Sequence, residues 1–244
     1  LEDHDTVIVG KAGSGVVNQT GGNLIAGNIT MGQTAGDGSG NGGLGEYNLS
    51  GGTVTIDTGQ FIIGLGGTVN DPASVFTQTG GTVSLDQFRV GNGSSGTGTA
   101  NISGGLLETT SSVTIGAANS DGVINYTGGE INIAGNLHVG WGNGSTGELI
   151  VTGTTLDVTG NMQVGDGGTA QGNVIQTGGV VNIGNTGNDA LILGDEAGAI
   201  GSWLVDGGTL AVAGGGMIGD AGEGYLKVTN GGSVTFAAAD LWMG

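Results

Sequence analysis

Cysteine is absent from this chain of 244 residues, proline occurs once, and aromatic residues make up only 4%. The lack of cysteine excludes a disulfide scaffold. Few aromatic side chains are expected where a thin interior is filled by valine, isoleucine and leucine. Glycine is abundant, with 60 residues, but it does not recur at every third position, so the chain is not collagen-like.

Basic residues are also scarce. Lys11, Arg89 and Lys227 stand against 21 aspartates and glutamates, which gives a formal net charge of −18. Binding a nucleic acid needs clustered lysine and arginine, so we expect no nucleic-acid partner. The same charge disfavours anionic membrane surfaces and polyuronate substrates, and it suits solubility, mutual repulsion or the capture of cations. No apolar run is long enough to span a bilayer.

A repeat runs through the whole chain. An apolar–x–apolar–Gly step alternates with a step that is mostly Ser/Thr-Gly-Gly, about half a unit later. The first step ends at ten landmark glycines: Gly10, Gly32, Gly64, Gly91, Gly116, Gly140, Gly165, Gly194, Gly219 and Gly244. They enclose nine units over 234 residues (244 − 10), an average of 26 per unit. A fixed period of this size indicates a stacked array in which each unit buries its apolar side chains against its neighbours.

Each unit predicts three short strands, because apolar and polar residues mostly alternate with period two. One strand precedes Gly-Gly, as at 124–126, a second follows it, as at 131–133, and a third leads into the landmark glycine, as at 137–139. The prediction is an all-β, three-faced parallel β-solenoid that forms one domain over residues 1–244, with about nine to ten rungs of about 24–26 residues. The extra residues of longer units are expected in loops at Gln33–Gly45, Leu65–Ser74 and Gly184–Ala190.

Two units carry a family resemblance. Gly-Thr-Gly-Thr-Ala-Asn-Ile-Ser-Gly-Gly at 96–105 and Gly-Tyr-Leu-Lys-Val-Thr-Asn-Gly-Gly at 224–232 resemble the repeats of autotransporter passenger domains and PEP-CTERM-associated surface proteins. The resemblance implies a right-handed β-helix, secreted or anchored at a bacterial surface, that acts as an adhesin, matrix component or passenger stalk. It supplies no catalytic residue, because the repeat motif contains none. The chain also begins and ends in phase with its repeat, so we expect it to be a segment of a longer or processed polypeptide.

Three carboxylates follow consecutive landmark glycines. Asp166, Asp195 and Asp220 would stack about 4.8 Å apart in aligned coils. Like charges at that spacing repel by roughly 1 kcal/mol even in water. A Ca²⁺ ion takes about six to eight oxygen ligands and would relieve this repulsion, so the sequence predicts these residues as candidate calcium ligands. The alternative is that they are solvated loop acids, splayed apart.

Apolar residues occupy the outward position of the third strand in three successive units. They are Ile192, Met217 and Trp242, where earlier units carry residues such as Arg89 and His138. A contiguous exposed apolar strip usually marks an interface, so we expect lateral self-association there. The alternative is that a loop folds over the strip, or that the register shifts near 214–216.

Two columns of polar residues are explained by hydrogen bonds within the coils. The Ser/Thr residues before Gly-Gly, such as Thr152 and Thr177, are expected to bond one another at a corner of the coil. Gln19, Gln78 and Gln176 occupy an inward position, where an amide most often satisfies backbone groups.

Catalysis has little support in the sequence. The only histidines, His4 and His138, lie several rungs apart, and carboxylates can be paired almost anywhere in so acidic a chain. We predict a non-enzymatic extracellular or cell-surface rod that serves structure or adhesion, stacks end-to-end or laterally, and has surface glycans as further candidate partners. The alternative is a carbohydrate-binding or carbohydrate-degrading β-helix. That function favours aromatic platforms along one groove, whereas Trp141, Trp203 and Trp242 fall at three different positions of the turn.

Overall fold

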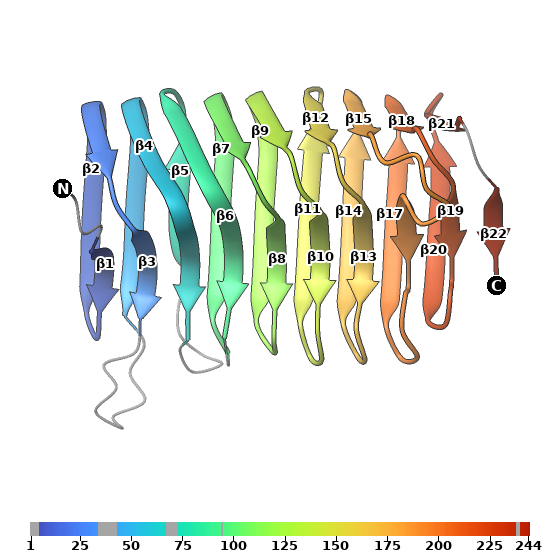
Figure 1. Ribbon diagram of the computed structural model, residues 1–244, viewed down its shortest axis with the longest axis horizontal. Helices are drawn as coiled ribbons and strands as arrows, with labels where there is room; N and C mark the ends of the chain where they lie inside the picture. Colours follow the sequence, from blue (N-terminus) through green and yellow to red (C-terminus); the bar gives the residue numbers. More distant parts are fainter. Residues whose placement is uncertain (1–4, 34–42, 67–72, 94, 238–239) are drawn as a thin grey trace.

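The computed structural model describes residues 5–33, 43–66, 73–93, 95–237 and 240–244. These residues form 22 β-strands and no helix. Accordingly, this part of the chain offers no helix that could cross a membrane. The strand pairs are parallel, and about nine coils stack side by side along one axis from the blue to the red end of the chain (Figure 1). The predicted parallel β-solenoid is confirmed.

The first face of each coil is built from the strand that precedes the Gly-Gly corner. These strands pair in register, for example Leu149 with Val174 and Val174 with Trp203. Coils 1 to 9 supply this face, in order, with β2 (Ser14–Ile25), β4 (Leu44–Leu65), β5 (Ser74–Gln78), β7 (Thr97–Thr109), β9 (Asp121–Ile133), β11 (Thr146–Thr152), β14 (Gln171–Thr177), β17 (Ile200–Asp206) and β20 (Glu223–Thr229).

The second and third faces follow the corner. The second face contains the later residues of β2, β4, β7 and β9, together with β6 (Thr82–Asn92), β12 (Thr155–Val158), β15 (Val180–Ile183), β18 (Thr209–Val212) and β21 (Ser233–Phe236). The third face contains the ends of β4 and β6, together with β1 (Thr6–Lys11), β3 (Asn28–Gln33), β8 (Val113–Ala117), β10 (Leu137–Trp141), β13 (Met162–Asp166), β16 (Leu191–Leu193), β19 (Gly216–Ile218) and β22 (Leu241–Met243). In the first five coils some of these segments join into longer strands, whereas coils 6 to 9 have three separate strands.

The core is a continuous stack of side chains that point inward from all three faces. Phe61, Phe76 and Phe88 pack in its N-terminal third, with ring centroids 5.1 Å apart for the first two and 5.7 Å apart for Phe61 and Phe88. Valine, isoleucine and leucine fill most of the later coils, and each of these buried side chains contributes about 1.5–3 kcal/mol of transfer free energy. Because every coil lies on the next, these side chains form one continuous core cluster.

Landmark glycines occupy the position where the third face turns toward the next coil. Gly165 has a φ of +70°, and a Cβ on it would lie 2.3 Å from the carbonyl oxygen of Ile200, at the start of β17. Neither the backbone conformation nor the space admits another residue. This double restriction is the physical basis of the repeat.

The expected loops differ in how far they can be described. Gln33–Gly45 and Leu65–Ser74 lie largely outside the described residues. Gly184–Ala190 is a loop between β15 and β16, as predicted. The coil keeps its phase across this loop, since Met162 pairs with Leu191.

In coils 1 to 8, a polar side chain lies inside the corner of every second coil. Gln78 Nε2 donates a hydrogen bond to the carbonyl oxygen of Leu106, and Gln176 Nε2 donates one to that of Thr209, both at 2.9 Å. Each bond reaches the next coil, so the interpretation that these glutamines satisfy backbone groups is confirmed. The coils between them carry apolar residues in the same row. The polar members are Gln19, Gln78, Tyr126 and Gln176, in coils 1, 3, 5 and 7.

Candidate functional site

The third face carries the residues singled out from the sequence, in two outward rows along the stack. In coils 5 to 9 one row contains His138, Gln163, Ile192, Met217 and Trp242. The second row follows the landmark glycines and contains Trp141, Asp166, Asp195 and Asp220. The structure therefore places the three predicted acids on one edge of the third face.

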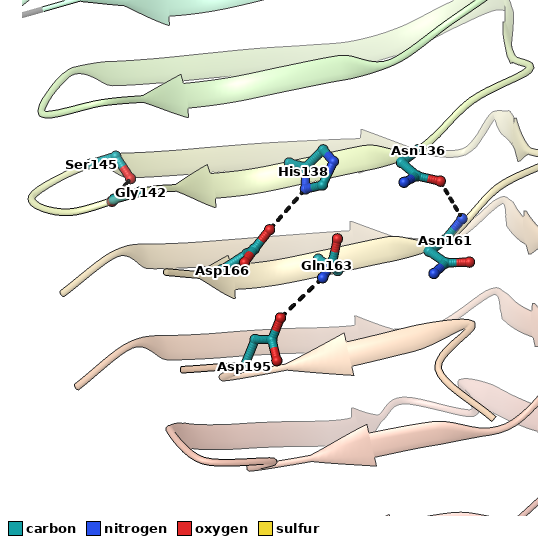
Figure 2. Close-up of polar contacts among 8 residues, drawn as sticks. All are labelled: Asn136, His138, Gly142, Ser145, Asn161, Gln163, Asp166 and Asp195. Atoms are coloured by element: carbon teal, nitrogen blue, oxygen red, sulfur yellow. Dashed lines mark hydrogen bonds and ion pairs between the residues drawn. The ribbon is translucent and has the colours of Figure 1, made fainter. Parts of the chain in front are cut away.

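Two of these acids bond to the preceding coil. Asp166 Oδ2 lies 3.0 Å from His138 Nδ1, and the two side chains are only 13% and 16% exposed (Figure 2). Asp195 Oδ2 accepts a 3.0 Å hydrogen bond from Gln163 Nε2, again one coil earlier (Figure 2). The same geometry thus recurs in consecutive coils, and it joins them outside the core.

The surroundings of Asp195 disfavour its negative charge. Partial burial raises the pKa of Asp195, and the neighbouring charge of Asp166 raises it further. The hydrogen bond from Gln163 acts in the opposite direction, while Asp220 and Glu196 add to the increase. The aspartates therefore lie close enough to interact, as the rung spacing predicts.

The calcium prediction concerns the same row of aspartates. Asp166 and Asp195 already have partners in His138 and Gln163. Over the described ranges, no group of three or more histidine, aspartate or glutamate side chains is arranged to hold a metal ion. Calcium binding by Asp166, Asp195 and Asp220 stays a prediction, based on their charge and spacing.

The apolar strip requires a correction in one residue. Ile192 was expected to be exposed, but its exposed fraction is only 6%. It lies in register between Gln163 and Met217, whose long side chains stand one rung away on either side. Met217 is partly buried, and Trp242 is 61% exposed. The accessible part of the strip is therefore Met217 and Trp242, and its role as an interface stays a prediction.

The three tryptophans have different surroundings. Trp203 is 1% exposed and belongs to the core, so it offers no surface platform. Trp141 is 41% exposed, and its ring centroid lies 6.0 Å from that of His138. Trp141 and Trp242 both lie on the third face, four rungs apart, which corresponds to about 19 Å.

Hydroxyl groups line the corner between the first and second faces. Thr177 Oγ1 donates a 3.1 Å hydrogen bond to Thr152 Oγ1 in the preceding coil. For this pair the predicted bonding between stacked hydroxyls is confirmed. Ser103 and Thr127 instead donate to backbone carbonyls of the previous coil, at 3.5 Å.

The first face carries an apolar row that the sequence analysis did not identify. Ile150, Ile175 and Leu204 are in register in coils 6 to 8, where they point outward and are partly buried. The available signal is the unbroken apolar triplets at 149–151 and 203–205, which depart from the period-two alternation of most strands.

Comparison with known proteins identifies no relative of this chain. No family model, curated protein or solved structure matches it. The resemblance to autotransporter passenger domains and PEP-CTERM-associated proteins therefore stays a prediction from the repeat motif.

Proposed function

We propose that this chain is a non-catalytic rod of an exported bacterial surface or matrix protein. The observation that supports this role most directly is the continuous parallel pairing of strands on all three faces, from coil 1 to coil 9. Backbone hydrogen bonds between coils run along the stack, so pulling or bending the rod strains many bonds together. Nine coils at about 4.8 Å extend roughly 43 Å.

The surface of the rod supports an extracellular location. A net charge of −18 favours solubility and mutual repulsion outside the cell, and the resemblance of the repeats implies export. Loops such as Gly184–Ala190 accept extra residues while the coil keeps its phase, so partner recognition can vary without loss of the rod. Neither feature requires a catalytic group.

Self-association is part of the proposal. Trp242 is 61% exposed and lies beside the partly buried Met217 on the third face. A second copy of the chain that packs laterally on this surface would bury the exposed apolar side chains.

Electron microscopy and sedimentation of the purified protein test the structural role. We expect rods or fibres, and a concentration-dependent assembly that becomes smaller in Trp242→Ser. Trp141→Ser removes an equally large exposed side chain from the middle of the third face and is the matched control. A strictly monomeric protein, or equal assembly by both variants, would contradict the proposed interface.

The location has its own test. Antibodies against the chain should label intact cells of the producing organism, because an exported rod is accessible from outside. Labelling that requires permeabilised cells would overturn the extracellular role without affecting the fold.

A further inference from the structure

A groove runs along the first face, parallel to the axis of the stack. It crosses β9, β11, β14 and β17, which Figure 1 shows as adjacent strands, and has a volume of about 300 Å³. Two outward rows of side chains form its walls. One wall contains Asp121, Thr146, Gln171 and Ile200, and the other contains Val123, Glu148, Asn173 and Ser202. Its volume is at the lower end of the range for small-molecule sites.

The floor of the groove is bare backbone. Gly122, Gly147 and Gly172 lie between the two walls in consecutive coils. A Cβ on Gly172 would lie 2.2 Å from the carbonyl oxygen of Val139, on the inner side of the sheet. The Cβ positions of this row point inward, so crowding inside the coil keeps the row glycine, and a ligand outside meets only backbone between the two walls.

The polar groups of one wall form a directional chain of hydrogen bonds. Ser202 Oγ donates to Asn173 Oδ1 at 2.8 Å, and Asn173 Nδ2 donates to Glu148 Oε1 at 3.0 Å. The Ser202 hydroxyl and one N–H of Asn173 are used within this chain of bonds, which ends on a carboxylate. Asp121 adds a second carboxylate to the opposite wall. The groove therefore presents mainly acceptors, which a ligand rich in hydroxyl groups satisfies.

An exposed aromatic ring stands at one end of the groove. Tyr225 follows Ser202 in the same row and is 55% exposed. Its hydroxyl donates a 2.7 Å hydrogen bond to Glu223 Oε2. Val123 and Ile200 add apolar surface to the walls. Apolar faces beside hydrogen-bond acceptors match a sugar ring, which has C–H faces and hydroxyl edges.

We propose that this groove binds an uncharged, hydroxyl-rich polysaccharide whose chain lies along the stack. The two rows that form its walls continue in register into β7 and β20, so a linear polymer can extend beyond the bound rings. Glu148 and Asp121 repel uronates and other anionic polymers, which selects against them. This inference rests on the proposed adhesive role and names the class of surface to which the rod attaches.

Affinity electrophoresis tests the groove, with gels that contain a neutral β-glucan, xylan or galactomannan, or polygalacturonate. We expect at least one neutral polymer, and not polygalacturonate, to retard the protein. Tyr225→Ala should weaken binding about tenfold, because it removes a stacking ring. Ser202→Trp fills the groove from an outward position and should abolish retardation.

Ser233→Trp is the matched control, since Ser233 is an outward, exposed residue of the second face. It should bind as the unmodified protein does. No retardation by any neutral polymer, or equal retardation of Ser202→Trp and Ser233→Trp, would overturn the inference. Electron microscopy of the same variants separates the two proposals, because the rod can form whether or not the groove binds a glycan.

Discussion

At the residue scale, the fold depends on glycines in the left-handed backbone conformation, which differ in how closely other coils approach them. Gly165 and Gly153 both have positive φ, of +70° and +66°. A Cβ on Gly153 would meet no atom within 4 Å, whereas a Cβ on Gly165 would lie 2.3 Å from the Ile200 carbonyl oxygen. Most landmark glycines, though not Gly219, therefore combine a left-handed backbone conformation with close approach between coils. Some corner glycines, such as Gly153, have the left-handed conformation alone.

We expect Gly165→Ala to cost more than about 3 kcal/mol of unfolding free energy, because the backbone of a neighbouring coil must move. Gly153→Ala should cost only about 1 kcal/mol, since its penalty is limited to the left-handed backbone conformation. Urea unfolding measures the loss of unfolding free energy in both variants, at two glycines that have nearly the same φ. Equal destabilisation would mean that close packing between coils is not the reason for the landmark glycines.

The raised pKa of Asp195 predicts a pH-dependent effect. Its ordinary value is 3.8, and burial together with Asp166 raises it in the folded chain. The unfolded chain therefore loses this proton at lower pH than the folded chain, so the residue destabilises the fold as pH rises above about 3.8. Asp195→Asn should raise the melting temperature at pH 7. The gain should vanish below about pH 3.8, where Asp195 is protonated in both the folded and the unfolded chain.

Asp121→Asn is the control for this effect, because Asp121 is exposed and has Thr97 and Thr146 as its neighbours in register. We expect it to leave the melting temperature almost unchanged. A gain for Asp195→Asn that persists at pH 3, or an equal gain for Asp121→Asn, would show that charge at position 195 is not the cause.

At the scale of the elements, the three strands of a unit were predictable because each has its own sequence signal. Alternation marks the strand, and glycine marks the corner. Which outward residues remain exposed was not predictable in the same way. Ile192 points outward but is only 6% exposed, and its neighbours in register, Gln163 and Met217, belong to other coils. The alternation of polar and apolar corners also escapes inspection of single units, because its period is two coils.

The polar corners should stabilise the stack. Gln176→Leu removes the donor to the carbonyl oxygens of Thr209 and Gly179, at 2.9 and 3.5 Å, and should cost about 1–3 kcal/mol. Ile102→Leu, in the same row of an apolar corner, conserves volume and should cost less than about 1.5 kcal/mol. Urea denaturation midpoints measure both. A Gln176→Leu variant as stable as the unmodified chain would mean that the amide only fills space.

At the scale of the whole molecule, the stack follows from the repeat, whereas the sites on it follow from register. The period of the glycines predicts coils of constant size, and hence rows of residues one rung apart. The groove on the first face could not be predicted, because its walls come from four coils between Asp121 and Ser202. Their side chains become neighbours only when Glu148 pairs with Asn173 and Asn173 with Ser202. Every surface site of the rod therefore depends on this register.

Disulfide formation between adjacent coils tests that register most directly, because the chain has no cysteine of its own. Thr152 and Thr177 are partners in register and their hydroxyl oxygens lie 3.1 Å apart. The double variant Thr152→Cys/Thr177→Cys should therefore form an intramolecular disulfide in mild oxidant. Thr127→Cys/Thr177→Cys, two coils apart at about 9.6 Å, should remain reduced. Failure of the adjacent pair to cross-link in the folded protein, or cross-linking of both pairs to the same extent, would contradict the stacked coil.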